Sequence, residues 1–199
     1  MRQPLFMQMK KRFIILCTCS FLFFISAAAQ SGPDTIVWSP KRLAWTDFRE
    51  VVTYDKYYRK LAKTRWYMHY QERDDSLTNE KHINVAATFI CNHSWVRKTS
   101  TNNYVLLAHE QLHFDITEIF ARRLRKELSS LKGGEALARR IEKIKSKTFS
   151  KLHNMQADYD LETAGGNKPD MQKWWYDFIV KNLQQLESFG FNEIVVPLK

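Results

Sequence analysis

Two histidines and a glutamate lie within one five-residue segment, His109-Glu110-Gln111-Leu112-His113. Two imidazoles four residues apart on a helix project side by side, and their neutral ring nitrogens can bind one Zn²⁺ ion. Glu110 follows the first histidine directly, so its carboxylate can accept the proton of a water molecule that zinc activates for attack on a carbonyl. We therefore expect Zn²⁺ as the cofactor, His109 and His113 as metal ligands, and Glu110 as the general base.

A catalytic zinc site usually has three protein ligands, so a further residue must complete this one. Candidates gather in the segment 153–162, which contains His153, Asp158, Asp160 and Glu162. Two antiparallel helices with a short connection at 133–134 would bring the end of the second helix back beside His109. This register favours Asp160 as the third ligand, with Glu162, Asp158 and His153 as open alternatives.

Three helices are expected to position these residues. The first spans about 103–129, and its apolar face is predicted to hold Val105, Leu112, Ile116 and Phe120 together with the two histidines. Its opposite, solvent-facing side is expected to carry Asp115, Glu118, Arg122 and Arg125. A second helix is predicted over about 135–159, and a third from Pro169 to about residue 186.

The part of the chain before residue 103 is rich in β-forming residues. Strands are predicted at 35–38, 65–70 and 82–91, and the turn-prone segment 73–80 favours a hairpin between the last two. Cys91 is expected to be a buried apolar residue at the end of this segment. The sequence thus predicts an α+β fold, in which a small N-terminal β portion packs on a C-terminal bundle of about three helices that carries the metal motif.

The N-terminus has the pattern of a secretory signal peptide. Lys10-Lys11-Arg12 precede an apolar run over 13–25, and Ala27-Ala28-Ala29 follow it. The run is shorter than the ~20 residues that a membrane-spanning helix needs, which disfavours a retained anchor. We expect cleavage after Ala29, a single domain over 30–199, no stable membrane insertion after cleavage, and a periplasmic or secreted location.

Composition limits the classes of function. Apolar residues make up 44% of the 199, which excludes a disordered chain. The net charge of +10 falls to a modest +6 once the four basic residues of the signal peptide are removed. Nucleic acid is therefore not expected as a partner.

Several segments resemble a bacterial family of secreted zinc-dependent proteases, a domain of unknown function. The similar segments are LLAHEQLHFDI at 106–116, SWV at 94–96, MQADYDLET at 155–163 and QKWW at 172–175. The resemblance implies a small zincin-like fold with His109, Glu110 and His113 in the roles given above. The family commonly has a histidine where this chain has Gly165, and if that histidine is the family's third ligand, the role moves here to Asp160 or Glu162.

Two functions from different classes follow from these features. The first is a secreted or periplasmic zinc-dependent peptidase that hydrolyses peptide or protein substrates. The alternative is a non-catalytic binding protein of the cell envelope that retains the fold. Loss of hydrolysis without loss of zinc on mutation of Glu110 would favour the peptidase.

Overall fold

The computed structural model describes residues 34–52 and 60–199, which belong to one unit spanning 32–199. The predicted signal peptide and its cleavage site lie outside the described residues. The strands are β1 (Thr35–Val37), β2 (Ala62–Lys63), β3 (Trp66–Asp75), β4 (Glu80–Ile90), β5 (Trp95–Val96) and β6 (Glu193–Pro197). The helices are α1 (Tyr104–Ser129), α2 (Leu137–Thr163) and α3 (Pro169–Gln185).

Strand β4 is the centre of an antiparallel sheet. It pairs along one edge with β3, from Trp66 opposite Phe89 to Asp75 opposite Glu80. Its other edge is shared by β1, near the end of β4, and by β6, near its start. The predicted hairpin is confirmed, although both strands extend further into the segment 73–80 than expected. Strands β2 and β5 form a separate antiparallel pair.

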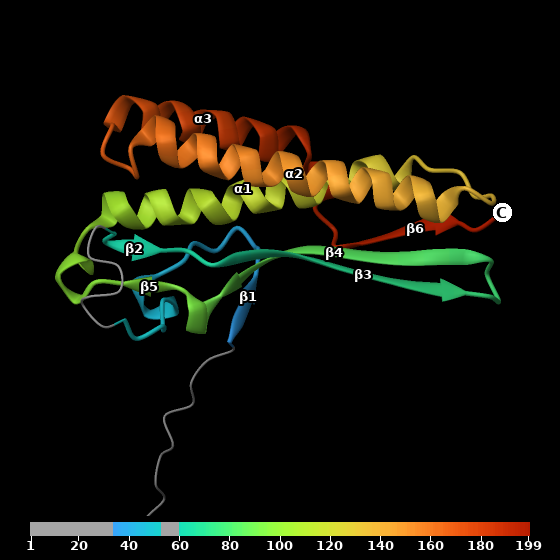
Figure 1. Ribbon diagram of the computed structural model, residues 1–199, viewed down its shortest axis with the longest axis horizontal. Helices are drawn as coiled ribbons and strands as arrows, with labels where there is room; N and C mark the ends of the chain where they lie inside the picture. Colours follow the sequence, from blue (N-terminus) through green and yellow to red (C-terminus); the bar gives the residue numbers. More distant parts are fainter. Residues whose placement is uncertain (1–33, 53–59) are drawn as a thin grey trace, which may run out of the picture. The chain divides into compact units, whose positions relative to one another are not determined.

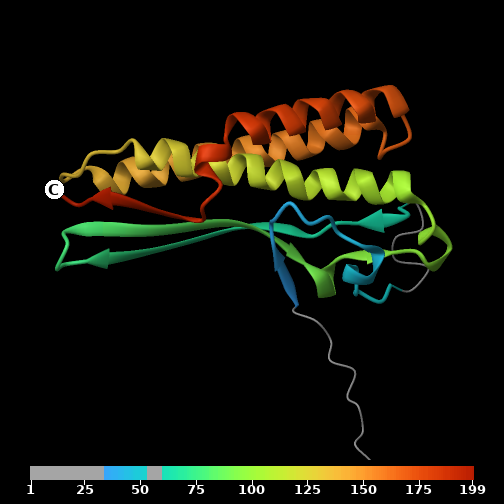
Figure 2. The ribbon, with the colours of Figure 1, turned by 180° about the vertical axis from the view of Figure 1, so that it is seen from behind.

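Helix α1 lies between the sheet and the other two helices (Figures 1 and 2). Its start is fixed by Asn103, whose side chain accepts a hydrogen bond from the backbone N–H of Leu106 at 2.9 Å. All three predicted helices are present, and α2 continues to Thr163, four residues beyond its expected end. The coarse prediction of an α+β fold with a small sheet and three helices is confirmed.

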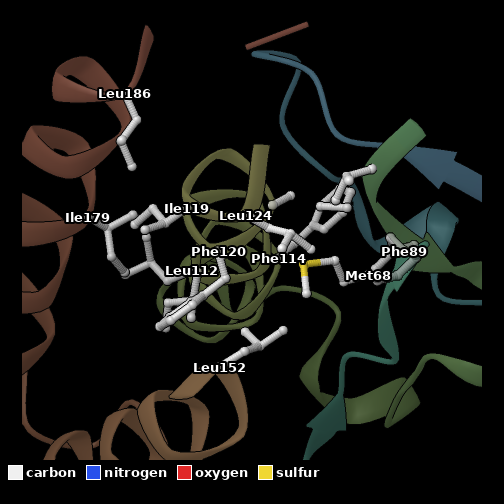
Figure 3. Packing of buried hydrophobic residues seen from close by; sticks show 14 of the residues in the cluster. Met68, Phe89, Leu112, Phe114, Ile119, Phe120, Leu124, Leu152, Ile179 and Leu186 are labelled. Atoms are coloured by element: carbon white, nitrogen blue, oxygen red, sulfur yellow. The ribbon is translucent and has the colours of Figure 1, made fainter. Parts of the chain in front are cut away.

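The hydrophobic core surrounds α1 on both sides. Met68 and Phe89 of the sheet pack against Phe114, while Leu152 of α2 and Ile179 of α3 approach the helix from the other side (Figure 3). Cys91 is fully buried, as predicted, and begins a short 3₁₀ turn after β4. Because it is buried on both sides, α1 is the central element of the fold.

Two expectations about the faces of α1 were wrong. Val105 is 59% exposed, because the first turn of the helix lies at the rim of a pocket rather than in the core. The side assigned to solvent is instead buried against the sheet and its neighbouring segments, including Asp115, Glu118, Arg122 and Arg125. A helix covered on both sides has no solvent face for these charges, so they must find partners inside the protein.

The buried charges of α1 are paired with one another and with the sheet. Glu118 Oε1 accepts hydrogen bonds from Arg122 Nε at 2.8 Å and from Arg125 at 2.7 Å. Arg125 also donates to the Val85 carbonyl oxygen of β4 at 2.6 Å. Asp115 accepts hydrogen bonds from Trp38 Nε1 at 2.8 Å and from Arg42 at 2.9 Å. These bonds compensate the burial of charge and attach α1 to the sheet and to the segment after β1.

Among the described residues, no helix has both the length and the apolar character required to cross a membrane.

Candidate metal centre

Three ligand-type side chains from two helices converge at one point. His109 and His113 lie one helical turn apart on α1, and Asp160 lies near the end of α2. Asp160 Oδ1 is 3.2 Å from His109 Nε2 and 3.0 Å from His113 Nε2. The three ligand atoms all lie within 4.8 Å of one another, which is the spacing of donors around a single cation.

The pairing of α1 with α2 places Asp160 at this point. The apolar stripe of α2, including Leu137, Ile141 and Leu152, is buried against the core. Because α2 runs back along α1, its last turns come beside the start of α1, as the sequence predicts. Helix α2 then ends with Ala164 in the left-handed conformation at φ 50°.

The other ring nitrogen of each histidine faces a glutamine amide oxygen. His113 Nδ1 lies 2.6 Å from Gln156 Oε1, and His109 Nδ1 lies 3.2 Å from Gln172 Oε1. An amide oxygen only accepts hydrogen bonds, so each Nδ1 carries the proton. The Nε2 atoms that face Asp160 are then left with lone pairs whenever the imidazoles are neutral.

This arrangement requires positive charge between the three ligand atoms. Two imidazole lone pairs and a carboxylate oxygen repel one another at 3.0–3.2 Å unless a proton or a metal ion separates them. Burial lowers the pKa of His113, but Asp160 and Glu110 outweigh it and raise that pKa above its ordinary value. Burial raises the pKa of Asp160, and the two histidines outweigh it and hold that pKa well below its ordinary range. The three ligand atoms therefore share either a proton or a metal ion.

Glu110 is buried beside this cluster and lines the same pocket. Its backbone carbonyl accepts a hydrogen bond from the Thr64 hydroxyl at 3.2 Å, which attaches the segment between β2 and β3 to α1. Among the residues that the structure describes, none donates a hydrogen bond to the Glu110 carboxylate.

The cluster opens into a pocket of about 830 Å³. One wall is the segment 60–68, and the others are the start of α1, the edge of α2 and the segment 164–167. Gly166 approaches His109 so closely that an added Cβ would lie 3.1 Å from His109 Cβ, so a side chain there would require a small shift of His109. At Gly165 an added Cβ would meet no atom within 4 Å.

The alternative third ligands do not reach the cluster. Glu162 accepts a hydrogen bond from Trp175 Nε1 at 2.9 Å, and Asp158 is exposed. His153 lines the pocket further along α2, where its ring packs on Trp66 at 5.2 Å between centroids. Of the four candidates only Asp160 shares the point where the two histidines meet.

Sequence reasoning missed the partners of the histidines. The sequence analysis gave no role to Gln156, and Gln172 entered it only as part of a segment that carries the family resemblance. The one available signal for Gln156 was its position four residues before Asp160, on the same helical face. Nothing local to Gln172 indicates its role, since its contact to His109 joins residues 63 positions apart.

Comparison with known proteins gives one family. Residues 52–167, more than half of the chain, match a family described as "Bacterial protein of unknown function (DUF922)". This range contains both histidines, Glu110 and Asp160. The comparisons with curated proteins and with solved structures gave no significant match.

Proposed function

The chain belongs to the DUF922 family of bacterial proteins of unknown function, and from the geometry of its site we propose that it is a zinc-dependent peptidase. One observation carries the proposal. His109 Nε2, His113 Nε2 and Asp160 Oδ1 converge within 4.8 Å, and Glu110 lines the same pocket. A zincin-like fold, in which the active-site helix packs beside a small sheet, is part of the same proposal.

The donor set fits zinc. Two imidazole nitrogens and one carboxylate oxygen are ligands that zinc accepts, and three protein ligands leave a position for water or substrate. His109, His113 and Asp160 would hold the ion. When bound, it supplies a Lewis acid that polarises a carbonyl and lowers the pKa of water toward neutrality.

Glu110 is assigned the proton transfer. It follows His109 in the chain, it is buried, and it lines the pocket that contains the ligands. In this role the carboxylate accepts a proton from the attacking water and gives it to the leaving amine. Tyr159 is not assigned to the reaction, because its hydroxyl bonds inside the protein with Gln172 and with the His109 carbonyl oxygen.

The pocket suits a peptide better than a small metabolite. Its volume of about 830 Å³ is near the upper end of ordinary ligand pockets. It extends along α2 from Asp160 past His153 to Phe149, opposite the segment 60–68. A pocket that extends this far along α2 accommodates several residues of an extended peptide chain.

The decisive experiment combines metal analysis with hydrolysis of an unfolded protein or a mixed peptide library. We expect one zinc per chain in the wild type and in Glu110→Gln, with hydrolysis only in the wild type. Glu127→Gln is the matched control, because Glu127 is exposed on the same helix. Wild-type turnover by Glu110→Gln would refute the mechanism.

The same experiment separates the peptidase from the second class of function. Stoichiometric zinc in a wild type that cleaves no peptide would favour a non-catalytic binding protein of the cell envelope. Export is proposed in both cases, and intact-mass measurement of the exported protein is expected to give a chain that begins at Gln30. A retained Met1 would refute the proposed cleavage.

A further inference from the structure

Each histidine of the cluster has a glutamine, rather than a carboxylate or a backbone carbonyl, against its Nδ1 atom. Gln156 comes from α2 and Gln172 from α3, and both are buried. Resting on the proposed metal site, we propose that Gln156 and Gln172 are positioning residues, which select the Nδ1–H form of both histidines and thereby set the metal affinity.

The orientation of the Gln156 amide is fixed from its other end. Its Nε2 group donates to the His113 carbonyl oxygen at 2.8 Å and lies 3.1 Å from Thr117 Oγ1. These contacts leave Oε1 directed at His113 Nδ1 at 2.6 Å. Gln156 thus holds the backbone and the side chain of one histidine together, and the flipped amide would place Oε1 against the His113 carbonyl oxygen, where two acceptors face each other.

The Gln172 amide is fixed less directly. The Tyr159 hydroxyl lies 2.8 Å from Gln172 Nε2, 3.0 Å from Gln172 Oε1 and 3.2 Å from the His109 carbonyl oxygen, so it holds the position of the amide but does not distinguish its two ends. The Tyr159 ring also stacks on the His109 ring, with centroids 4.6 Å apart. His109 is therefore oriented through two residues, whereas one residue orients His113.

The selection of the Nδ1–H form matters because Asp160 favours the other neutral form, with the proton on Nε2. Without metal, the Asp160 carboxylate favours a proton on each Nε2, which is the atom that must be free to bind metal. The glutamines favour the proton on Nδ1 instead. Removal of Gln156 should therefore shift His113 toward the form that cannot bind, and partners of this kind typically contribute roughly tenfold to a hundredfold in metal affinity.

The test measures zinc affinity by competition with a chelator in the full exported chain. We expect Gln156→Leu to bind zinc roughly 10–100-fold more weakly, and Gln156→Glu, which keeps an acceptor at Nδ1, to stay within about threefold of the wild type. The control is Gln111→Leu, which removes a buried glutamine of α1 that bonds to Leu43 and Asp115 and to neither histidine ring. A smaller loss is expected for Gln172→Leu than for Gln156→Leu.

A second measurement does not need metal. In the metal-free protein at a pH where His113 is neutral, its imidazole proton should be on Nδ1 in the wild type and shift toward Nε2 in Gln156→Leu, and the ¹⁵N chemical shifts of the two ring nitrogens distinguish these forms. The same tautomer in both proteins, or equal zinc affinity of the wild type and Gln156→Leu, would overturn the proposal. A wild type that binds no zinc at all but shows the tautomer difference would refute the proposed function and leave the selection of the Nδ1–H form supported.

Discussion

Helix α1 carries two buried polar clusters whose charges are balanced in different ways. In the second half of the helix, Glu118 receives hydrogen bonds from Arg122 and Arg125, so opposite charges meet directly. In the first half, Asp160 meets His109 and His113 through atoms that all have lone pairs when the imidazoles are neutral. The first cluster therefore has its opposite charges paired within the protein, so that removing one partner should be costly. The second is the site for which we propose a metal ion.

The largest effect is expected from breaking the cluster around Glu118. Glu118→Leu leaves two buried arginines without their shared carboxylate, and the free energy of unfolding should fall by about 3–5 kcal/mol. Urea denaturation measures this loss in the free energy of unfolding. Glu127→Leu, an exposed position on the same helix, is the control and should change stability little. A loss below about 1 kcal/mol for Glu118→Leu would mean that the arginines find other partners.

Zinc binding at the proposed site of His109, His113 and Asp160 should stabilise the fold. Zinc at a hundredfold excess over its dissociation constant is expected to add about 2.7 kcal/mol to the free energy of unfolding. His109→Ala and His113→Ala should abolish this gain, whereas His153→Ala, which alters a pocket histidine outside the cluster, should retain it. Thermal denaturation with and without zinc is the measurement. An equal gain in His113→Ala would place the metal elsewhere.

Removing the single anionic ligand should have an intermediate effect. We expect Asp160→Ala to weaken zinc binding by at least roughly tenfold, or about 1.4 kcal/mol. Asp158→Ala, two residues earlier and exposed, serves as the control and should bind normally. If Glu162→Ala bound zinc more weakly than Asp160→Ala, Glu162 would replace Asp160 as the third ligand.

The smallest effect concerns pH in the metal-free protein. A raised His113 pKa stabilises the fold below the ordinary histidine value of 6.5, and this contribution disappears as the pH rises through the raised value. A lowered Asp160 pKa stabilises the fold above the ordinary value of 3.8 and loses its effect as the pH falls through the lowered value. The stability difference between wild type and Asp160→Asn should therefore be greatest between these two values. A difference that keeps growing above neutral pH would contradict the pairing.

The same comparison explains what the sequence could and could not predict. The spacing of His109 and His113, and the return of α2 along α1, were predictable because helical periodicity and a short connection determine them. The burial of Glu118 and Arg125 was not, since four charged residues on one side of a helix ordinarily indicate a solvent face. Only the packing of the sheet against that side reverses the expectation.

The histidine partners were unpredictable for a different reason. Gln156 and Gln172 act through contacts between residues 43 and 63 positions apart, and glutamine has no preference that marks such a role. Strand ends were missed where turn-prone residues such as Asp74 and Asp75 pair with β4 in spite of their local preference. In each case a residue distant in sequence determined the contact or the secondary structure.

The continuous burial of α1 also determines how the backbone opens. From His109 to Arg122 every residue is buried, so no stretch of this helix can unfold while the sheet and the other two helices stay in place. Its amide protons should therefore exchange with solvent only when the whole domain opens. The two histidines are thus anchored in the slowest-opening part of the chain. Asp160, near the end of α2 with its side chain half exposed, belongs to a segment that can detach first, and metal release would begin there.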